Sequence, residues 1–406
     1  MKEKFISGGI CASVGFKAAG MFTGLGTNPD KNDVGIIFCE KKCSAAAVYT
    51  QNKVKGAPIL VTKRHIEDGK AQAVIVNSKN ANTCNADGEE KAQMMCDMLA
   101  EKLGINADDV IVASTGVIGQ PLNIQPIKDN IGNLVKKLSD DGSDECARAI
   151  MTTDTKKKEI AVEFEAGGKT CHIGGIAKGS GMIHPNMATM LCFITTDVNI
   201  SSTMLNKVLT EVTKVTFNRV SVDGDTSTND MACVMACGLA ENEEITAKND
   251  DYDKFKSALY SIMRYLSREI ARDGEGATKL LECVCIGAKD ERTAEIVAKA
   301  VITSSLFKAA MFGADANWGR VLCAIGYAEA DFDINKVDVT LGSSKGTIEV
   351  CRNGSGVDFS EETAKEILLE DEIKIHVLLH QGKAEAVAWG CDLTYDYVKI
   401  NGDYRS

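Results

Sequence analysis

Apolar positions along this chain follow two spacings, one typical of strands and the other typical of helices. Residues 72–76 form a β-rich apolar run, residues 89–103 carry apolar side chains three and four positions apart, and residues 109–113 return to a strand-like run. Two further helices are expected at 124–138 and 144–151. This alternation of strands and helices predicts a mixed α/β fold.

The rest of the chain continues the mixture. Residues 159–165 and 170–176 are separated by the turn sequence AGGK, which predicts a β-hairpin, and another strand is expected to begin near Met187. Helices are then expected at 203–215, 252–272 and 293–311, and strands at 280–286, 336–341, 347–351 and 372–379. Five prolines and no low-complexity linker give no composition break for a domain boundary.

Composition and charge narrow the class of protein. A net charge of −11 over 406 residues argues against a nucleic-acid surface, which needs clustered Lys and Arg to neutralise phosphates. The sequence contains no apolar run as long as a membrane span, and its first residues do not resemble a signal peptide. We therefore expect a cytoplasmic protein that binds neither nucleic acid nor membrane.

Cysteine and histidine positions do not predict a metal site. The fifteen cysteines are scattered, odd in number and never spaced CxxC, which favours reduced thiols. His376 and His380 are four residues apart in the strand-like sequence IKIHVLLH, but no third ligand accompanies them. His184 lies in a loop and is expected to make only local hydrogen bonds.

The most informative passage is GGIAKGSGMIHPNMATML, residues 174–191. Its four glycines, one lysine, one proline and one asparagine predict an irregular loop that delivers Ala188 and Thr189 to the start of an apolar strand. From composition alone, a glycine-rich loop that turns a corner is the simplest interpretation, because strain must be observed before function is inferred from it.

The passage nonetheless resembles the self-cleaving motif of the ornithine acetyltransferase family nearly throughout, and the resemblance extends over essentially the whole chain. Two departures concern Lys79, where the family usually has glycine, and Ser13-Val14, where it has a proline-containing segment. The other similar segments are GFKAAG (15–20), NSKNAN (77–82), ASTGVIG (113–119), MTTDT (151–155), DGDTSTND (223–230), DGEGATK (273–279), GADANWGR (313–320) and YVKINGDYRS (397–406).

The resemblance implies that the chain cuts itself between Ala188 and Thr189. The products would be an N-terminal chain, 1–188, and a C-terminal chain, 189–406, which includes a C-terminal α/β subdomain. Thr189 would then be an N-terminal nucleophile whose own α-amino group serves as the base. An α-amino pKa of about 7.7–8.0 in model compounds is close to working pH, where a general base is most useful.

The resemblance also assigns the remaining site residues. Thr115 would supply its hydroxyl and Gly116 its backbone N–H to the oxyanion. The implied substrate contacts are Thr152 or Thr153, Lys178, Thr189, Glu275, Asn401 and Ser406. Lys178 suits a substrate carboxylate and Glu275 suits the cationic side chain of ornithine. The sequence leaves open which of the two threonines contacts substrate, and how one site accepts both ornithine and glutamate.

The implied activity is a ping-pong acetyltransferase of arginine biosynthesis, which moves acetyl from N-acetylornithine through Thr189 to glutamate. No cofactor is expected, although acetyl-CoA stays open as a second donor and co-substrate. The implied fold is a sheet-on-sheet core flanked by helices, as in the self-cleaving ornithine acetyltransferase and aminopeptidase superfamily. The cleavage fragments are expected to form a heterotetramer of two copies of each chain.

Three alternatives remain. A related self-cleaving aminopeptidase or amidase would use serine as nucleophile and would lack the DGEGATK and YVKIN segments present here. A binding-only relative would keep Thr189 in peptide linkage. A dinucleotide enzyme is weaker, because Gly24-Leu25-Gly26 follows no convincing strand and lacks the full GxGxxG spacing.

Overall fold

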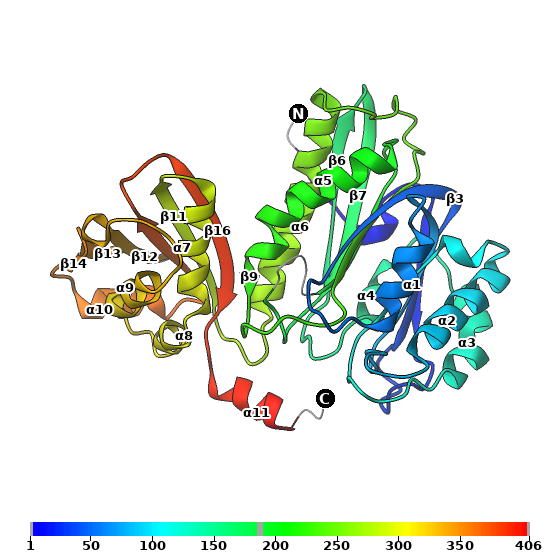
Figure 1. Cartoon of the computed structure of the whole chain (residues 1–406), viewed down its shortest axis with the longest axis horizontal. Coiled ribbons are helices and arrows are strands. Elements are labelled where there is room, and N and C mark those ends of the chain that lie inside the picture. The colour runs from blue at the N-terminus through cyan, green and yellow to red at the C-terminus, as the bar shows by residue number, and fades with distance from the viewer. Residues whose placement is uncertain (1–2, 185–189, 404–406) are drawn as a thin grey trace.

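The computed structural model describes residues 3–184 and 190–403, and its strands form two separate sheets (Figure 1). The strands of the larger sheet are β1 (Lys4–Ile6), β2 (Phe16–Met21), β3 (Val34–Tyr49), β4 (Lys70–Asn77), β5 (Val110–Ser114), β6 (Lys158–Ala166), β7 (Lys169–Lys178), β8 (Leu191–Thr196) and β10 (Met231–Ala236). The strands of the smaller sheet are β9 (Val220–Ser221), β11 (Leu280–Ala288), β12 (Asp338–Ser343), β13 (Gly346–Arg352), β14 (Ser355–Gly356), β15 (Glu372–Leu378) and β16 (Ala384–Cys391).

Helices pack against both sheets. They are α1 (Ala57–His65), α2 (Gly88–Leu103), α3 (Gln125–Lys136), α4 (Ser143–Ala149), α5 (Ser202–Val215), α6 (Asp250–Arg272), α7 (Glu291–Thr303), α8 (Ser305–Phe312), α9 (Trp318–Gly326), α10 (Glu361–Leu368) and α11 (Tyr395–Asp403). Short 3₁₀ turns occur at η1 (Gly9–Cys11), η2 (Ala107–Asp109), η3 (Phe217–Arg219) and η4 (Ile334–Lys336). None of the helices in the described ranges is long and apolar enough to cross a membrane.

The larger sheet folds over onto itself through β3. Its order is β1-β6-β7-β8-β10-β3-β4-β5, with β2 also paired to β3, so β3 joins two halves of the sheet. The β3–β4 ladder is irregular between Phe38 and Cys43, where the long strand changes partner. Val74 of β4 and Phe193 of β8 belong to one buried cluster, so the two halves face each other across a shared core.

The outer faces of both halves are covered by helices, because apolar side chains occupy both faces of these strands. On one side, Ile75 of β4 belongs to a cluster with Leu99 of α2 and Ile131 of α3. On the other, Ile194 of β8 belongs to a cluster with Leu259 of α6 and residues of α5. The order helix, sheet, sheet, helix confirms the predicted sheet-on-sheet core flanked by helices.

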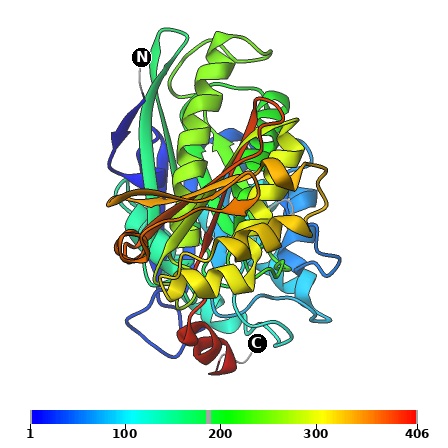
Figure 2. The ribbon, with the colours of Figure 1, turned by 90° about the vertical axis from the view of Figure 1, so that its left-hand side faces the viewer.

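The smaller sheet has the order β14-β13-β12-β15-β11-β16-β9 and its own apolar core with α7–α10. Figure 1 shows this unit beside the larger one, with α6 between them, and Figure 2 shows it from its outer side with α11 at its lower edge. Trp389 of β16 joins the same cluster as Leu259 of α6. The long helix therefore links both sheets in one packed structure.

The predicted helix at 293–311 is wrong in one respect, because the structure divides it into α7 and α8. Ser304 stands between them in an extended conformation (ψ 110°), and its hydroxyl accepts a hydrogen bond from the Phe307 N–H at 3.3 Å. A serine cap satisfies a free N–H at the start of the new helix. Met187, where a strand was expected to begin, lies outside the described residues, and β8 begins at Leu191.

Candidate active site

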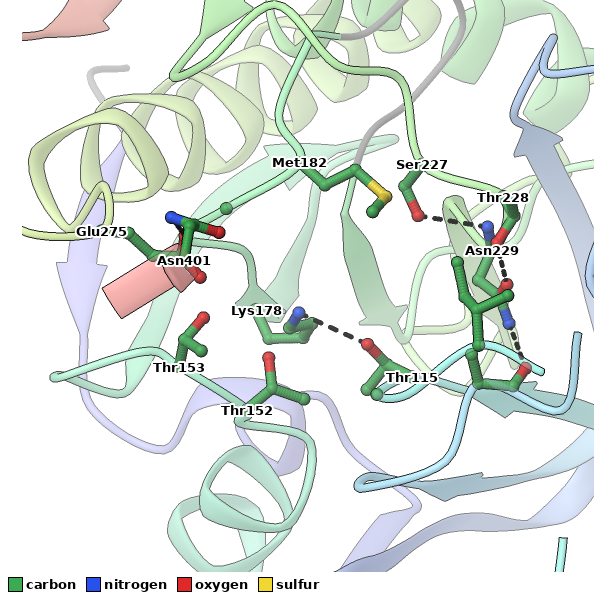
Figure 3. Close-up of a pocket in the computed structure, with 14 residues that line it drawn as sticks. Thr115, Thr152, Thr153, Lys178, Met182, Ser227, Thr228, Asn229, Glu275 and Asn401 are labelled. Carbon is green, nitrogen blue, oxygen red and sulfur yellow. Dashed lines mark hydrogen bonds between the residues drawn. The ribbon is translucent and has the colours of Figure 1, made fainter. Parts of the chain in front are cut away.

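A cavity of about 190 Å³ collects residues from segments far apart in the sequence (Figure 3). Seven of its lining residues are those that the sequence analysis singled out: Thr115, Gly116, Thr152, Thr153, Lys178, Glu275 and Asn401. The others are Ala81, Ile118, Gly181, Met182, Ser227, Thr228 and Asn229. The fold therefore brings these predicted residues together in one place, while their individual roles stay predictions.

Three predicted site residues, Ala188, Thr189 and Ser406, lie outside the described residues. Met190, which follows Thr189 in the sequence, is buried, and its carbonyl oxygen accepts a hydrogen bond from the Met231 N–H at 2.9 Å. Met231 begins β10 directly after Asn229 and Asp230. The described chain on the C-terminal side of the predicted cut therefore enters the sheet beside cavity-lining residues.

Thr115 and Gly116 follow the C-terminal end of β5. The Thr115 N–H donates to the Asn77 carbonyl oxygen at 3.0 Å, and the Lys178 ammonium donates to the Thr115 hydroxyl at 3.4 Å. Gly116 has a φ of 131°, and a Cβ placed there would lie 2.2 Å from the carbonyl carbon of Lys79. Only glycine fits this turn, because any side chain would collide with backbone.

Gly116→Ala is therefore expected to displace the turn that carries the predicted oxyanion donor. Loss of one such donor typically lowers kcat by about 10²–10³-fold, and the acetyl-transfer rate measures it. Gly119→Ala is the matched control, since Gly119 also has a positive φ (77°) but no atom lies within 4 Å of a Cβ added there. Equal rates for the two variants would contradict this interpretation of Gly116.

Lys178 ends β7 beside a buried network of charges that the sequence analysis missed. The Lys158 ammonium lies 2.6 Å from a carboxylate oxygen of Asp154 and 2.6 Å from one of Asp273. The Gly179 N–H donates to Asp154 at 2.8 Å. Burial alone would raise the pKa of Asp154, but the positive charges of Lys158 and Lys178 and these hydrogen bonds lower it to about 2. Asp154 is therefore ionised, and it accepts hydrogen bonds from the N–H groups of Thr152, a cavity-lining residue, and of Gly179, which follows the cavity-lining Lys178.

One side of the cavity carries the carboxylate of Glu275. The Glu275 N–H donates to the Ser180 carbonyl oxygen at 2.9 Å, and the Asn401 side-chain amide donates to a Glu275 carboxylate oxygen at 2.8 Å. Figure 3 shows Glu275 and Asn401 together at one side, with Lys178 between them and Thr115. Asn401 lies on α11, so the C-terminal segment returns to the cavity as far as this residue.

Asn229 lines the far side of the cavity and was also missed. Its side-chain amide donates to the carbonyl oxygens of Ala81 at 2.6 Å and Ser114 at 2.9 Å, while the Thr83 hydroxyl donates to its oxygen at 2.6 Å. Asn229 is buried and joins the segments that follow β4 and β5. The motif DGDTSTND contained this residue, but an amide has no charge that would have singled it out.

Loop residues on the N-terminal side of the predicted cut are held by the segment 223–230, which also contains Asn229. The N–H groups of Met182 and Ile183 donate to the Asp223 carboxylate at 2.6 and 2.9 Å, and the Thr226 hydroxyl donates to the His184 carbonyl oxygen at 2.8 Å. His184 Nδ1 lies 3.0 Å from the hydroxyl of Ser221, which is distant in the sequence, so its contacts are not confined to the loop as expected. These bonds hold residues 182–184 against the segment that begins at Asp223.

Within the described parts of the chain, no group of three His, Cys, Asp or Glu side chains is arranged to hold a metal ion. His380, which was considered as a ligand with His376, lies 2.6 Å from Asp338 instead. The polar groups available in the cavity are hydroxyls, two side-chain amides, one lysine, one carboxylate and backbone N–H groups. Such groups suit acyl transfer.

A model of the ArgJ family matches residues 17–406. The chain belongs to the ArgJ family. The matched range includes every residue that lines the cavity, from Ala81 to Asn401. Membership in the ArgJ family therefore applies to the complete cavity and not to an isolated motif.

Known ArgJ proteins are similar over nearly their full length. Arginine biosynthesis bifunctional protein ArgJ 1 of Clostridium acetobutylicum is 51% identical over 96% of each chain. Arginine biosynthesis bifunctional protein ArgJ of Caldanaerobacter subterraneus subsp. tengcongensis is 48% identical over 99% of this chain and all of its own. A crystal structure of the ArgJ protein of Bacillus halodurans is 49% identical, with a TM-score of 0.50, and covers 52% of this chain and 98% of its own.

Proposed function

We propose that this chain is a self-cleaving acetyltransferase of arginine biosynthesis that moves acetyl from N-acetylornithine to glutamate. The observation that carries the proposal is the cavity, where seven predicted site residues of an ArgJ-family chain meet. Its relatives at 48–51% identity are named as bifunctional proteins of arginine biosynthesis. The enzyme acts in the cytoplasm, and its cleavage fragments assemble as a heterotetramer of two copies of each.

Self-cleavage comes first. The Thr189 hydroxyl attacks the carbonyl carbon of Ala188, the acyl group shifts from nitrogen to oxygen, and water hydrolyses the resulting ester. This releases the α-amino group of Thr189 as a base for its own hydroxyl. A cut there would leave a C-terminal chain of 218 residues. In support, the solved ArgJ chain of Bacillus halodurans matches only 52% of this chain with 98% of its own length.

Acetyl transfer follows in two half-reactions. The Thr189 hydroxyl attacks the acetyl carbonyl of N-acetylornithine while its α-amino group takes the proton, which then passes to the departing amine of ornithine. The Thr115 hydroxyl and the Gly116 N–H stabilise the oxyanion. Because the Lys178 ammonium donates to the Thr115 oxygen, the Thr115 hydroxyl proton is free to point at that anion. The amine of glutamate then attacks the acetyl ester and regenerates Thr189.

Lys178, in the middle of the cavity, and Glu275, at one side of it, orient the donor. Lys178 also faces the substrate carboxylate, since an ammonium can donate three hydrogen bonds. Glu275, held by Asn401, receives the side-chain ammonium of N-acetylornithine. The enzyme needs no cofactor, and acetyl-CoA is the second acetyl donor that gives this bifunctional family its additional reaction.

Glu275→Gln is expected to weaken the binding of N-acetylornithine but not that of acetyl-CoA. A hydrogen bond to a charged group is typically worth about 1.5–3 kcal/mol, so KM for N-acetylornithine should rise roughly 10- to 150-fold. Steady-state kinetics with each donor measures this, and acetyl-CoA is the internal control because it carries no ammonium side chain for Glu275. An equal rise for both donors would contradict the assigned contact.

The function is tested by following a labelled acetyl group. N-Acetylornithine with a deuterated acetyl group is mixed with enzyme and glutamate, and the products are separated by mass spectrometry. The proposal predicts deuterated N-acetylglutamate in step with released ornithine. Deuterated acetate at the same rate with or without glutamate would instead identify a hydrolase of the self-cleaving aminopeptidase kind.

A further inference from the structure

Lys79 projects into a second cavity that adjoins the candidate active site. This cavity has a volume of about 360 Å³, and both cavities include Thr152 in their walls. Its inner wall is formed by Lys79, Met151, Thr152 and Asp154, and its exposed rim by Asp30, Lys31, Glu145 and Arg148. Thr152 is therefore the point at which the surroundings of Lys79 adjoin the acetyl-transfer cavity.

The backbone of Lys79 adopts a conformation that lysine rarely takes. Its φ is 79°, in the left-handed region that favours glycine. A non-glycine residue held there is strained, and the conformation persists only where its surroundings determine it. The surroundings here are the candidate oxyanion turn, because the Val117 N–H donates to the Lys79 carbonyl oxygen at 3.2 Å and Gly116 packs against its carbonyl carbon.

The side chain of Lys79 ends in an ammonium group without a counter-ion. Its Nζ donates to the Met151 carbonyl oxygen at 3.4 Å, and among the described residues no carboxylate lies within ion-pair distance of it. Burial lowers its pKa, and the positive charges of Lys31 and Lys178 lower it further, while Asp33 and Asp154 oppose this effect. An anionic partner stabilises a half-buried cation of this kind, because burial has removed part of its hydration.

Three acids line this cavity, and none of them forms an ion pair with Lys79. Asp30 is exposed at the rim. Asp154 is already engaged by Lys158 at 2.6 Å and by the Gly179 N–H. Glu145 is exposed at the rim and accepts a hydrogen bond from the Asn32 side chain at 2.6 Å. The inner part of the cavity therefore presents the positive charge of Lys79.

We propose that Lys79 forms an anion-binding subsite for a substrate held in the acetyl-transfer cavity. The ligand is a carboxylate or phosphate group, either the side-chain carboxylate of glutamate or a phosphate of acetyl-CoA. The inference rests on the proposed function and addresses how one site accepts both ornithine and glutamate. The cation of ornithine is received at the Glu275 side, whereas an anionic group of a substrate would extend beside Thr152 towards Lys79.

Three substitutions separate the charge of Lys79 from its backbone strain. Lys79→Gly removes the cation and relieves the unfavourable φ, Lys79→Met removes the cation and keeps most of the stem, and Lys79→Arg keeps a positive charge. Steady-state KM is measured for glutamate, N-acetylornithine and acetyl-CoA in each variant and in the wild type. Lys79→Gly and Lys79→Met should both raise the KM for an anionic substrate about tenfold or more. Lys79→Arg should keep a KM close to that of the wild type.

The substrate that responds identifies the ligand. A rise confined to glutamate assigns the subsite to the acceptor carboxylate, and a rise confined to acetyl-CoA assigns it to a phosphate. Unchanged KM values, equal rises for all three substrates, or a rise in only one of the Gly and Met variants would overturn the inference. In each of these cases wild-type transfer would leave the proposed function intact, whereas a wild-type enzyme without transfer would contradict the function itself.

Discussion

Thr189→Ala is expected to leave the chain whole at 43.5 kDa and to abolish acetyl transfer. Alanine has no hydroxyl, so neither the attack on the Ala188 carbonyl nor the acetyl-enzyme can form. The transfer rate should fall by roughly a thousandfold or more. Gel electrophoresis under denaturing conditions and the labelled acetyl assay measure the two effects on the same sample.

Two further variants make this result specific to Thr189. Thr189→Ser keeps a hydroxyl and should retain part of both cleavage and transfer. Thr210→Ala is the matched control, because the Thr210 hydroxyl donates only to the Asn206 carbonyl oxygen within α5. A Thr189→Ala protein that is cut and active would refute the mechanism.

Asp154→Ala is expected to lower the free energy of unfolding by about 3–5 kcal/mol, because it breaks a buried ion pair from one side. The side chains of Asp154 and Lys158 are at most 1% exposed. Removal of the Asp154 carboxylate therefore leaves the buried Lys158 ammonium with only Asp273 as its ion-pair partner among the described residues. Denaturant titration at pH 7 measures the loss. Asp144→Ala is the control, since Asp144 pairs with Arg148 on the surface, where such pairs contribute at most about 1 kcal/mol.

The same carboxylate gives stability a defined pH dependence. With a folded-state pKa of about 2 against an ordinary value of 3.8, Asp154 binds its proton more weakly when folded. It therefore contributes about 2 kcal/mol above pH 4, and this contribution is lost as pH falls from about 4 towards 2. The stability difference between wild type and Asp154→Ala should shrink over that range.

For the comparison at pH 7, equal losses of stability in the Asp154→Ala and Asp144→Ala variants would contradict the role given to the buried pair.

Regular elements with a strong apolar pattern were predictable from sequence. The expected helix at 89–103 corresponds to α2 (Gly88–Leu103), and the expected strand at 72–76 lies within β4 (Lys70–Asn77). The expected helix at 293–311 failed at Ser304, because apolar spacing continues across a residue whose side chain caps a new helix. β3 was not anticipated, since its sixteen residues change partners along their length and carry no single period.

The candidate site was predictable from motifs only in part. Thr115 and Glu275 were found because the sequence around each resembles a known motif. The network of Lys158 with Asp154 and Asp273 was not found, because it depends on residues brought together from opposite halves of the chain. The positive φ of Lys79 had one sequence signal, the glycine that the family usually has at this position, but its cavity and its contacts became visible only in the fold.

The central claim is an acetyl group carried on Thr189 of a self-cleaved chain, and intact-mass spectrometry under denaturing conditions tests it most directly. The purified protein is measured before and after mixing with N-acetylornithine in the absence of glutamate. The account predicts two chains divided between Ala188 and Thr189, with one acetyl group gained by the second chain and lost again when glutamate is added. A single unmodified chain of 43.5 kDa that nevertheless transfers acetyl would contradict it.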